Sequence, residues 1–229
     1  MVRDPIERIE SHWLNCKIMG WPKIIASQNT HIVGIKRIKT CQKLSIGTSS
    51  VRFIDKDLHS YLNILGTLCI EKQSHLGRGV KFEIAPGATV ILKGCSIGSS
   101  VFRIFHYLEI GTDTLISRDC EFIDDNVHSI IKSEEFSSNL NELSSRLDND
   151  NNSDKLVPQC TSHHSSYSGI VIGNHVWINP GCRILPNVFI ADNCVVATGS
   201  IVTKSFPEKN CLIAGVPARV IRKNIAWKS

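Results

Sequence analysis

Apolar residues recur every six positions along the last part of the chain. An aliphatic side chain stands at five successive steps: Ile172, Ile178, Ile184, Ile190 and Val196. Four places after each comes a small or β-branched residue: Val176, Cys182, Val188, Cys194 and Ser200. An amphipathic helix would repeat every three or four residues, and a half-buried strand every two, so a period of six fits neither. The pattern instead predicts a solenoid in which each hexad supplies one short parallel strand and a turn.

Three such hexads close one turn of a triangular prism. The first residue of each hexad then points inward, and the aliphatic side chains stack in columns along the axis. Glycine, asparagine and proline near the corners tolerate the tight bends. Each coil buries its apolar surface only against its neighbours, so several coils are needed for stability.

The upstream sequence follows the same period less strictly. Isoleucine–glycine pairs recur in similar settings, with the isoleucines at Ile46, Ile97, Ile110 and Ile172. Further hexads begin at Ile84, Val90, Ile110, Ile116 and Phe122, with one-residue slips before Ile97 and Ile110. We therefore predict an all-β solenoid over residues 41–205, irregular early and regular late. Residues 1–40 are expected to be a cap over one open end. Within this cap Asp4 and Pro5 indicate the start of a short helix.

Bulk properties narrow the function classes. The chain has 229 residues, 42% of them hydrophobic, and a formal charge of +5. This mild charge does not require nucleic acid as a partner. No apolar run is long enough to span a bilayer, and the first residues do not form a signal peptide, so we expect a cytoplasmic protein. The 9 cysteines are scattered and form no C-x-x-C pair, which indicates small buried hydrophobes in a reducing compartment.

The hexad run and the segment that follows it resemble a known family. The segment reads GSIVTKSFPEKNCLIAGVPARVIRKNIAW, and A-G-V-P-A-R-V-I-R is its most specific part. It is similar to the hexapeptide-repeat acyltransferases, and closest to the saccharide and capsular polysaccharide O-acetyltransferases. The match is strong over residues 170–227, fair over 44–130 and absent before 44 and within 131–168. The resemblance implies a left-handed parallel β-helix, acetyl-CoA as co-substrate, no metal, and a homotrimer with active sites between subunits.

The resemblance also indicates a general base. An alcohol at neutral pH is a weak nucleophile toward a thioester, and imidazole, with a pKa near 6.5, is suited to accept its proton. The family's catalytic histidine follows an Asp-containing turn, and D-D-N-V-H-S-I places His128 there. The alternative is a surface-loop histidine without a role. Asp124, Asp125 and Asn126 would orient the imidazole or hold sugar hydroxyls, or they are only turn residues.

Two other histidines are rivals for this role. His163 and His164 lie in a Ser-rich segment that indicates solvent exposure. With His128 they would also be the raw material of a zinc site like that of the carbonic-anhydrase-like hexapeptide proteins, but their spacing does not favour one.

Coenzyme contacts also follow from the family's motif. They fall on Thr198, Gly199, Thr203, Lys204, Arg219 and Arg222. The two arginines suit a phosphorylated coenzyme. Pro217 is expected to start a short helix in the C-terminal tail, residues 206–229, with both arginines on one face and Val220, Ile221 and Ile225 against the prism. Pro180 replaces a small polar residue that is frequent in relatives.

Trp177 resembles the family's aromatic residue beside the acceptor and the thioester arm, and so is expected to contact both substrates. Alternatively, it packs against another subunit. In the expected trimer, His128 of one chain would face Trp177 of another.

Residues 131–168 interrupt the solenoid. They are rich in serine, asparagine and aspartate and offer little core. Phe136, Leu140, Leu143 and Leu147 recur at helical spacing, which predicts a short helix within a lid over the acceptor cleft.

The leading hypothesis is an acetyl-CoA-dependent O-acetyltransferase that acts on a saccharide hydroxyl by direct attack. The acceptor is a surface or capsular polysaccharide or a sugar precursor. N-acetylation of an amino sugar or nucleotide sugar stays open, because an amine would need the same base. A zinc carbonic-anhydrase-like protein and a non-catalytic binding solenoid are the further alternatives.

Overall fold

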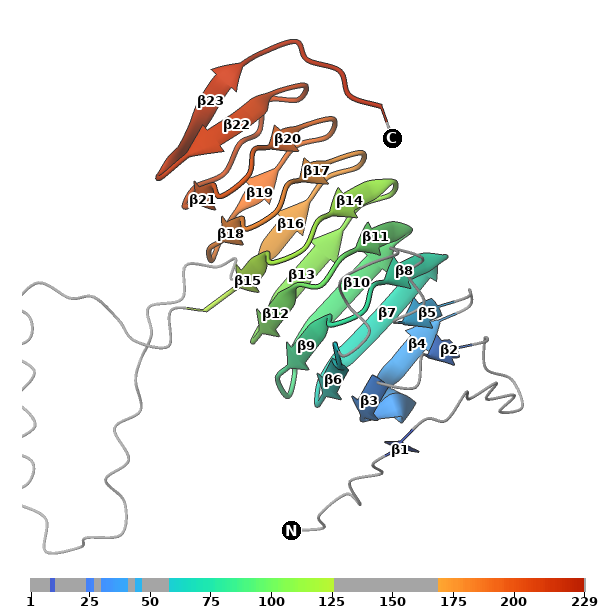
Figure 1. The fold of residues 1–229 in the computed structure, drawn as a ribbon. Coiled ribbons are helices and arrows are strands. Elements are labelled where there is room, and N and C mark those ends of the chain that lie inside the picture. The colour runs from blue at the N-terminus through green and yellow to red at the C-terminus, as the bar shows by residue number, and fades with distance from the viewer. Residues whose placement is uncertain are drawn as a thin grey trace, which may run out of the picture. The chain divides into compact units, whose positions relative to one another are not determined.

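Three parallel sheets enclose a single apolar core and run along a stack of triangular coils (Figure 1). The computed structural model describes residues 9–10, 24–26, 30–40, 44–46, 58–125 and 169–228. The chain visits the sheets in a fixed cyclic order, which we name B, A and C. Turns between successive sheets define three edges, named BA, AC and CB in chain direction. The predicted left-handed parallel β-helix is confirmed.

Among the described residues, face A contains eight strands: β1 (Ile9–Glu10), β3 (Thr30–Val33), β6 (Ser60–Ile64), β9 (Lys81–Ile84), β12 (Val101–Ile104), β15 (Glu121–Ile123), β18 (Arg183–Ile184) and β21 (Ile201–Val202). In the same described ranges, face B contains nine strands: β2 (Ile24–Ala26), β5 (Leu44–Ile46), β8 (Ser74–Leu76), β11 (Cys95–Ile97), β14 (Thr114–Ile116), β17 (Trp177–Ile178), β20 (Val195–Val196), β22 (Leu212–Gly215) and β23 (Ala218–Arg222). Face C contains six strands in the part of the chain that the structure describes: β4 (Ile38–Thr40), β7 (Thr67–Lys72), β10 (Thr89–Lys93), β13 (Tyr107–Ile110), β16 (Ile170–Ile172) and β19 (Phe189–Ile190). One short 3₁₀ turn, η1 (Ile35–Arg37), precedes β4.

The late coils follow the six-residue period without error. Ile172 pairs with Ile190, and Ile178 pairs with Val196, each partner lying three hexads further along the chain. All five aliphatic residues that lead the hexads have 0% exposure. Because their side chains alternate inward, they form the apolar columns that the sequence predicts.

The early coils are longer and less regular, as expected. β7 spans six residues, and its register with β10 shifts between Leu92 and Lys93. The isoleucine–glycine pairs at Ile97, Ile110 and Ile172 mark places where the next coil approaches closely. A Cβ atom on Gly111 would lie 2.4 Å from the carbonyl oxygen of Gly173, so only glycine fits there.

The stacking begins earlier than the sequence predicts. β2, β3 and β4 already pair in parallel with β5, β6 and β7, so coils start at Ile24 and not near residue 41. Residues Ile9–Glu10 form strand β1, antiparallel to β3, where a helix is expected. The rest of the predicted helix lies outside the described residues. The irregular spacing of apolar residues in this segment conceals the coils from a search for hexads.

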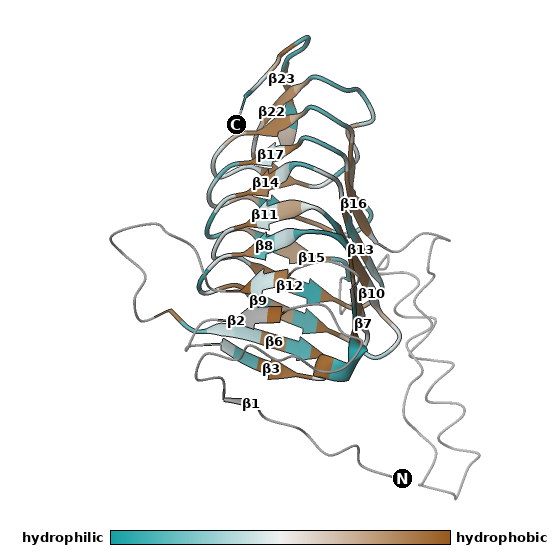
Figure 2. Ribbon diagram, turned by 90° about the vertical axis from the view of Figure 1, so that its right-hand side faces the viewer, coloured by the Kyte–Doolittle hydropathy of each residue, from teal (hydrophilic) through white to brown (hydrophobic). Residues whose placement is uncertain are grey.

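Face A carries an aromatic column inside the prism. The Phe82 and Phe102 rings stack at 4.3 Å and 4°, and the Phe102 and Phe122 rings at 4.6 Å and 17°. All three side chains have 0% exposure. On face C the strands β7 to β16 form a nearly continuous hydrophobic band (Figure 2). The described cysteines are free thiols, and all but Cys69 are buried, which confirms the prediction of small buried hydrophobes for most of them.

The predicted C-terminal helix is wrong. Residues Ala218–Arg222 form strand β23, which pairs antiparallel with β22 at the end of the stack (Figure 1). Pro217 lies in the turn between these strands, after Gly215 at φ 107°. The last coil leaves β22 with an unpaired edge, and a returning strand satisfies those backbone groups where a helix would not. Val220 packs partly on the core, but Ile221 is 63% exposed, in contrast to the predicted apolar helix face.

No helix in the described part of the chain is long and apolar enough to cross a membrane.

Candidate functional site

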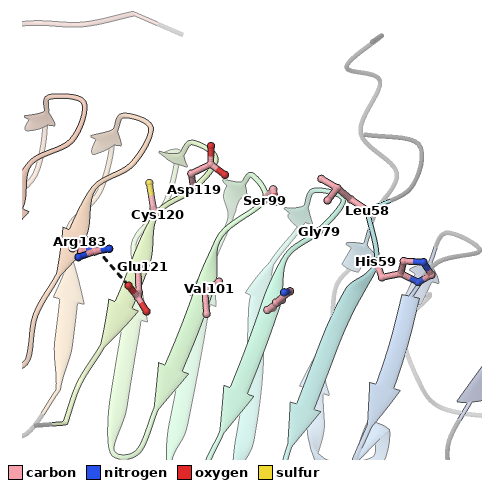
Figure 3. A pocket seen from close by; sticks show the side chains of 10 residues that line it. Leu58, His59, Gly79, Ser99, Val101, Asp119, Cys120, Glu121 and Arg183 are labelled. Carbon is pink, nitrogen blue, oxygen red and sulfur yellow. Dashed lines mark ion pairs between the residues drawn. The ribbon is translucent and has the colours of Figure 1, made fainter. Parts of the chain in front are cut away.

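A groove of about 450 Å³ lies along the BA edge (Figure 3). Five successive coils contribute to it. The lining residues are Leu58, His59, Gly79, Lys81, Ser99, Val101, Asp119, Cys120, Glu121 and Arg183. The edge turns expose polar groups, while strands β9, β12, β15 and β18 direct outward side chains toward it because residues alternate along a strand. The groove therefore forms from residues of several stacked coils, and these residues do not belong to one continuous sequence motif.

Charged side chains form a ladder on the face A side of the groove. Arg183 lies 3.5 Å from Glu121, and Glu121 also forms an ion pair with Arg103. Arg103 in turn lies 3.6 Å from Glu83. Lys81 lines the same groove, and among the residues that the structure describes no ion pair involves it. The groove thus offers both acidic and basic groups to a polar ligand.

Two of the predicted coenzyme contacts lie on the same edge, further along the stack. Thr198 and Gly199 are exposed at the turn after β20. Backbone hydrogen bonds connect the successive turns: the Gly181 N–H donates to the Arg118 carbonyl at 3.1 Å, and the Gly199 N–H donates to the Pro180 carbonyl at 2.9 Å. Gly199 has a φ of 70°, and no atom lies within 4 Å of an added Cβ. The BA edge therefore continues from the groove to an open backbone turn.

The remaining predicted coenzyme contacts lie elsewhere. Thr203 and Lys204 are exposed at the AC edge, at the other end of the two-residue strand β21. Lys204 Nζ stands 5.9 Å from the centroid of the Phe206 ring. Arg219 and Arg222 are exposed on β23. Within one chain, then, the predicted coenzyme residues lie at three places near the end of the stack: the BA edge, the AC edge and strand β23 of face B.

Trp177 points outward from face B and is 37% exposed. Its ring lies 5.8 Å from that of Trp227 at an angle of 40°. Trp227 also stacks on His175, with ring centroids 4.0 Å apart and planes 9° apart. Trp177 is thus a partly exposed indole with a fixed aromatic neighbour.

Asp124 has a structural role. It is 1% exposed, and its carboxylate accepts hydrogen bonds from the backbone N–H groups of Phe105, His106 and Tyr107 at 2.7, 2.8 and 2.8 Å. These contacts occupy both carboxylate oxygens and fix the turn of the preceding coil. A role for Asp124 in holding sugar hydroxyls therefore finds no support in its surroundings.

Asp125 differs from Asp124. Its Oδ2 atom lies 3.4 Å from Nε2 of His106, and both side chains are about one-third exposed, at 33% and 30%. This pair stands at the AC edge, just before the interruption of the coils. The sequence alone did not indicate His106, because it lies one coil earlier and has no motif around it.

The predicted general base directly precedes the interruption of the hexads. Asn126, His128, His163, His164 and the segment 131–168 lie outside the described residues. β13 pairs with β16 and β15 pairs with β18, so the described coils stop after β15 on face A and resume with β16 on face C.

No group of three or more His, Cys, Asp or Glu side chains within the described ranges is arranged to hold a metal ion.

Comparisons with known proteins agree with the fold. The family model of bacterial transferase hexapeptide repeats (six repeats) matches residues 169–204. A 24.8 kDa protein of the cps region of Klebsiella pneumoniae is 33% identical over 208 residues, which cover 90% of this chain and 81% of that protein. The putative lipopolysaccharide biosynthesis O-acetyl transferase WbbJ of Escherichia coli K12 is 35% identical over 114 residues, about half of each protein.

Among solved structures, the polySia-specific acetyltransferase NeuO superimposes with a TM-score of 0.51 and 19% identity, covering 91% of this chain and 82% of that one. This likeness supports the fold. The identity to the Klebsiella protein extends over most of both chains, and the hexad run matches the transferase repeat. The chain therefore belongs to the hexapeptide-repeat acetyltransferases.

Proposed function

We propose that this protein transfers an acetyl group from acetyl-CoA to a hydroxyl of a saccharide, with His128 as the general base. The acceptor would be a surface or capsular polysaccharide or one of its sugar precursors. The hydroxyl attacks the thioester carbonyl while His128 takes the hydroxyl proton. The C–S bond then breaks, and the departing thiolate takes that proton from His128, so coenzyme A leaves as the thiol. Holding both substrates in one complex supplies much of the rate through positioning.

The observation that carries this proposal is the groove on the BA edge. It lies in line with the exposed turn at Thr198 and Gly199, where the coenzyme is expected. Its lining combines carboxylates, cations and a hydroxyl, which are the groups that hold sugar hydroxyls by hydrogen bonds. An acceptor in the groove would present a hydroxyl toward the thioester end of a coenzyme that runs along the same edge.

Exposed cations support the coenzyme's placement. Lys204, Arg219 and Arg222 are exposed near the end of the stack, and none of them forms an ion pair with another described residue. Guanidinium and ammonium groups that are not already paired can bind the phosphates of coenzyme A.

The base is expected at a different edge. His128 follows Asp125 by three residues, so chain connectivity alone keeps their Cα atoms within about 11 Å. Asp125 ends the described part of face A at the AC edge, whereas Trp177 is on face B and the groove is at the BA edge. These edges are separated within one prism. A trimer in which the AC edge of one chain meets the BA edge of the next would complete the site, and we propose this arrangement.

The test is a thiol-release assay with acetyl-CoA and a panel of mono- and oligosaccharides. We expect His128→Ala to lower kcat by at least about a hundredfold, the usual contribution of a positioned base. Acetyl-CoA should still bind to that variant in calorimetry. His163→Ala and His164→Ala serve as matched controls and should retain turnover.

Normal turnover in His128→Ala would overturn the assignment of the base. Failure of the wild-type protein to bind acetyl-CoA would favour a non-catalytic solenoid. Amino sugars in the acceptor panel distinguish N-acetylation from O-acetylation. Stoichiometric zinc in the purified protein would instead favour a carbonic-anhydrase-like enzyme.

A further inference from the structure

The chain after β23 returns along the CB edge instead of leaving the stack (Figure 1). Two polar contacts hold its first residues against the stack. The Ile225 N–H donates to the Asn210 carbonyl at 2.9 Å, and Lys223 Nζ lies 2.7 Å from Glu208 in an exposed ion pair. Exposed ion pairs contribute little, so these two contacts alone would hold the segment weakly.

Trp227 provides a much larger contact. Its ring stacks on His175, its indole N–H donates to the His175 carbonyl at 2.9 Å, and its own carbonyl lies 3.2 Å from Nε2 of His175. The other ring nitrogen, Nδ1, lies 2.7 Å from Oδ2 of Asp113. The imidazole is therefore held between a carboxylate on one coil and the C-terminal segment.

The backbone places His175 for this contact. Its φ of 52° is left-handed, like that of Asp113, Asn193 and Asn210 at the same edge. Aspartate, asparagine and histidine are the side chains other than glycine that tolerate this conformation best. Of these, only histidine also offers a flat ring on which an indole can stack.

Trp177 is two residues further along than His175, and its ring is a neighbour of the Trp227 ring. Its ring lies 5.8 Å from that of Trp227, on the outer side of face B. Because Trp227 is fixed by a stack and two polar contacts with His175, it limits the positions that the Trp177 ring can adopt.

We propose that Trp227 and His175 form a clamp that positions Trp177 for acetyl transfer, so that Trp227 is a positioning residue of the active site. The inference rests on the proposed function, in which Trp177 lies beside the acceptor and the thioester. The clamp differs from a simple tail anchor, because a tail anchor would act only on coenzyme affinity through Arg219 and Arg222.

The experiment compares four variants of the full chain. Trp227→Ala removes the clamp, Trp227→Phe keeps a stacking ring without the indole donor, and His175→Asn keeps a residue that tolerates the left-handed turn without the imidazole. Lys228→Ala changes the neighbouring tail residue and is the matched control. We expect Trp227→Ala and His175→Asn to lower kcat about tenfold, as misplacement of a reacting group does, with KM for acetyl-CoA changed less than about threefold.

Trp227→Phe should lie between wild type and Trp227→Ala, and Lys228→Ala should match wild type. Wild-type kcat in both Trp227→Ala and His175→Asn would overturn the proposal, and so would a loss confined to KM for acetyl-CoA. If Trp227→Ala does not fold, Trp227→Phe and His175→Asn decide by the same criteria.

A second readout separates the clamp from the proposed function. Near-UV circular dichroism reports fixed packing of the indoles, and trypsin cleavage after Arg222 or Lys223 reports release of the tail. We expect weaker tryptophan bands and faster cleavage in Trp227→Ala and His175→Asn. Unchanged bands and cleavage would show that no clamp exists. The two proposals can fail separately. If His128→Ala keeps full turnover while Trp227→Ala and His175→Asn still show weaker bands and faster cleavage, the proposed base is wrong and the clamp stands.

Discussion

Asp192 connects three coils at the CB edge. Its carboxylate lies 2.7 Å from Lys209 Nζ and accepts the Asn174 N–H at 2.8 Å and the Asn174 side-chain amide at 3.3 Å. The hydrogen bond from Lys209, followed by that from the Asn174 backbone, lowers the pKa of Asp192 below its ordinary value of 3.8, although burial acts in the opposite direction. The charged form is therefore the one that stabilises the edge.

This shift predicts a pH-dependent effect of Asp192→Asn. A carboxyl group with a lowered pKa contributes stability that is fully present above its unfolded pKa and is lost as the pH falls through the folded pKa. We expect the variant to melt about 2–4 °C below wild type at pH 7, the shift that about 1 kcal/mol causes in a chain of this size. The difference should shrink as the pH falls below 3.8.

Thermal melts followed by circular dichroism between pH 7 and pH 3 measure this difference. Asp119→Asn is a matched control, because the Asp119 side chain is 71% exposed at the BA edge. A gap between wild type and Asp192→Asn that stays constant across this pH range would contradict the assignment of the effect to the carboxylate charge.

At the scale of the elements, the short strands gain their stability from columns of side chains. A strand of two or three residues, such as β18 or β15, is too short to be stable alone, so its neighbours in the stack must hold it. On face A the Phe82, Phe102 and Phe122 rings form such a column. Its central ring contacts the coils on both sides.

We therefore predict that Phe102→Ala lowers the free energy of unfolding by about 3–5 kcal/mol, because it removes two ring stacks and leaves a cavity. Chemical denaturation measures the loss. Phe105→Ala is the matched control, since Phe105 is 40% exposed three residues later, and it should change stability by less than about 1 kcal/mol. Equal losses in the two variants would show that the aromatic column is not what holds the coils.

At the scale of the whole molecule, a prediction follows from the separation of the AC edge, where His128 is expected, from face B, where Trp177 lies. If His128 and Trp177 act from different chains, His128→Ala and Trp177→Ala each impair every site of their own trimers. A mixed trimer, by contrast, regains some sites in which both residues are intact. Random assembly of His128→Ala with Trp177→Ala in equal amounts should restore about a quarter of the wild-type sites, since one in four interfaces then joins the two intact residues.

Co-expression of the two variants, followed by the thiol-release assay and measurement of the mass in solution, tests this arrangement. Each variant alone, and a mixture of separately purified variants before subunit exchange, are the controls. A co-expressed mixture no more active than either variant alone, or a monomeric mass, would contradict a site shared between chains.

Much of the fold was predictable from the residues. The hexads from Ile172 to Val196 lie in the predicted columns, and the interruption falls where face A would pass to face C. The repeat can be recognised in the sequence because each coil repeats the same local packing. The period is therefore kept even when single positions vary. The early coils, which start at Ile24, are not predicted by a search for hexads, because their lengths vary and the sequence then has no strict period.

The candidate site was only partly predictable. The motif at the end of the chain indicated Thr198, Gly199 and the two arginines, but the tail is a strand and not a helix, because the open edge of β22 supplies hydrogen-bond partners that local sequence does not reveal. The roles of Asp124, Arg183 and Trp227 depend on residues in other coils. No local pattern could have shown that Asp124 holds the turn at Phe105.

The sequence by itself determined that the chain forms a parallel coil stack, since a six-residue period has one efficient way to bury its aliphatic positions. Only the tertiary structure decided which residues share an edge. Stacking brings Asp113 and His175 of successive coils into contact, and the C-terminal segment adds Trp227 to them. The groove and the tail clamp therefore arise from the register between coils, which depends on every turn length and cannot be read from any one segment.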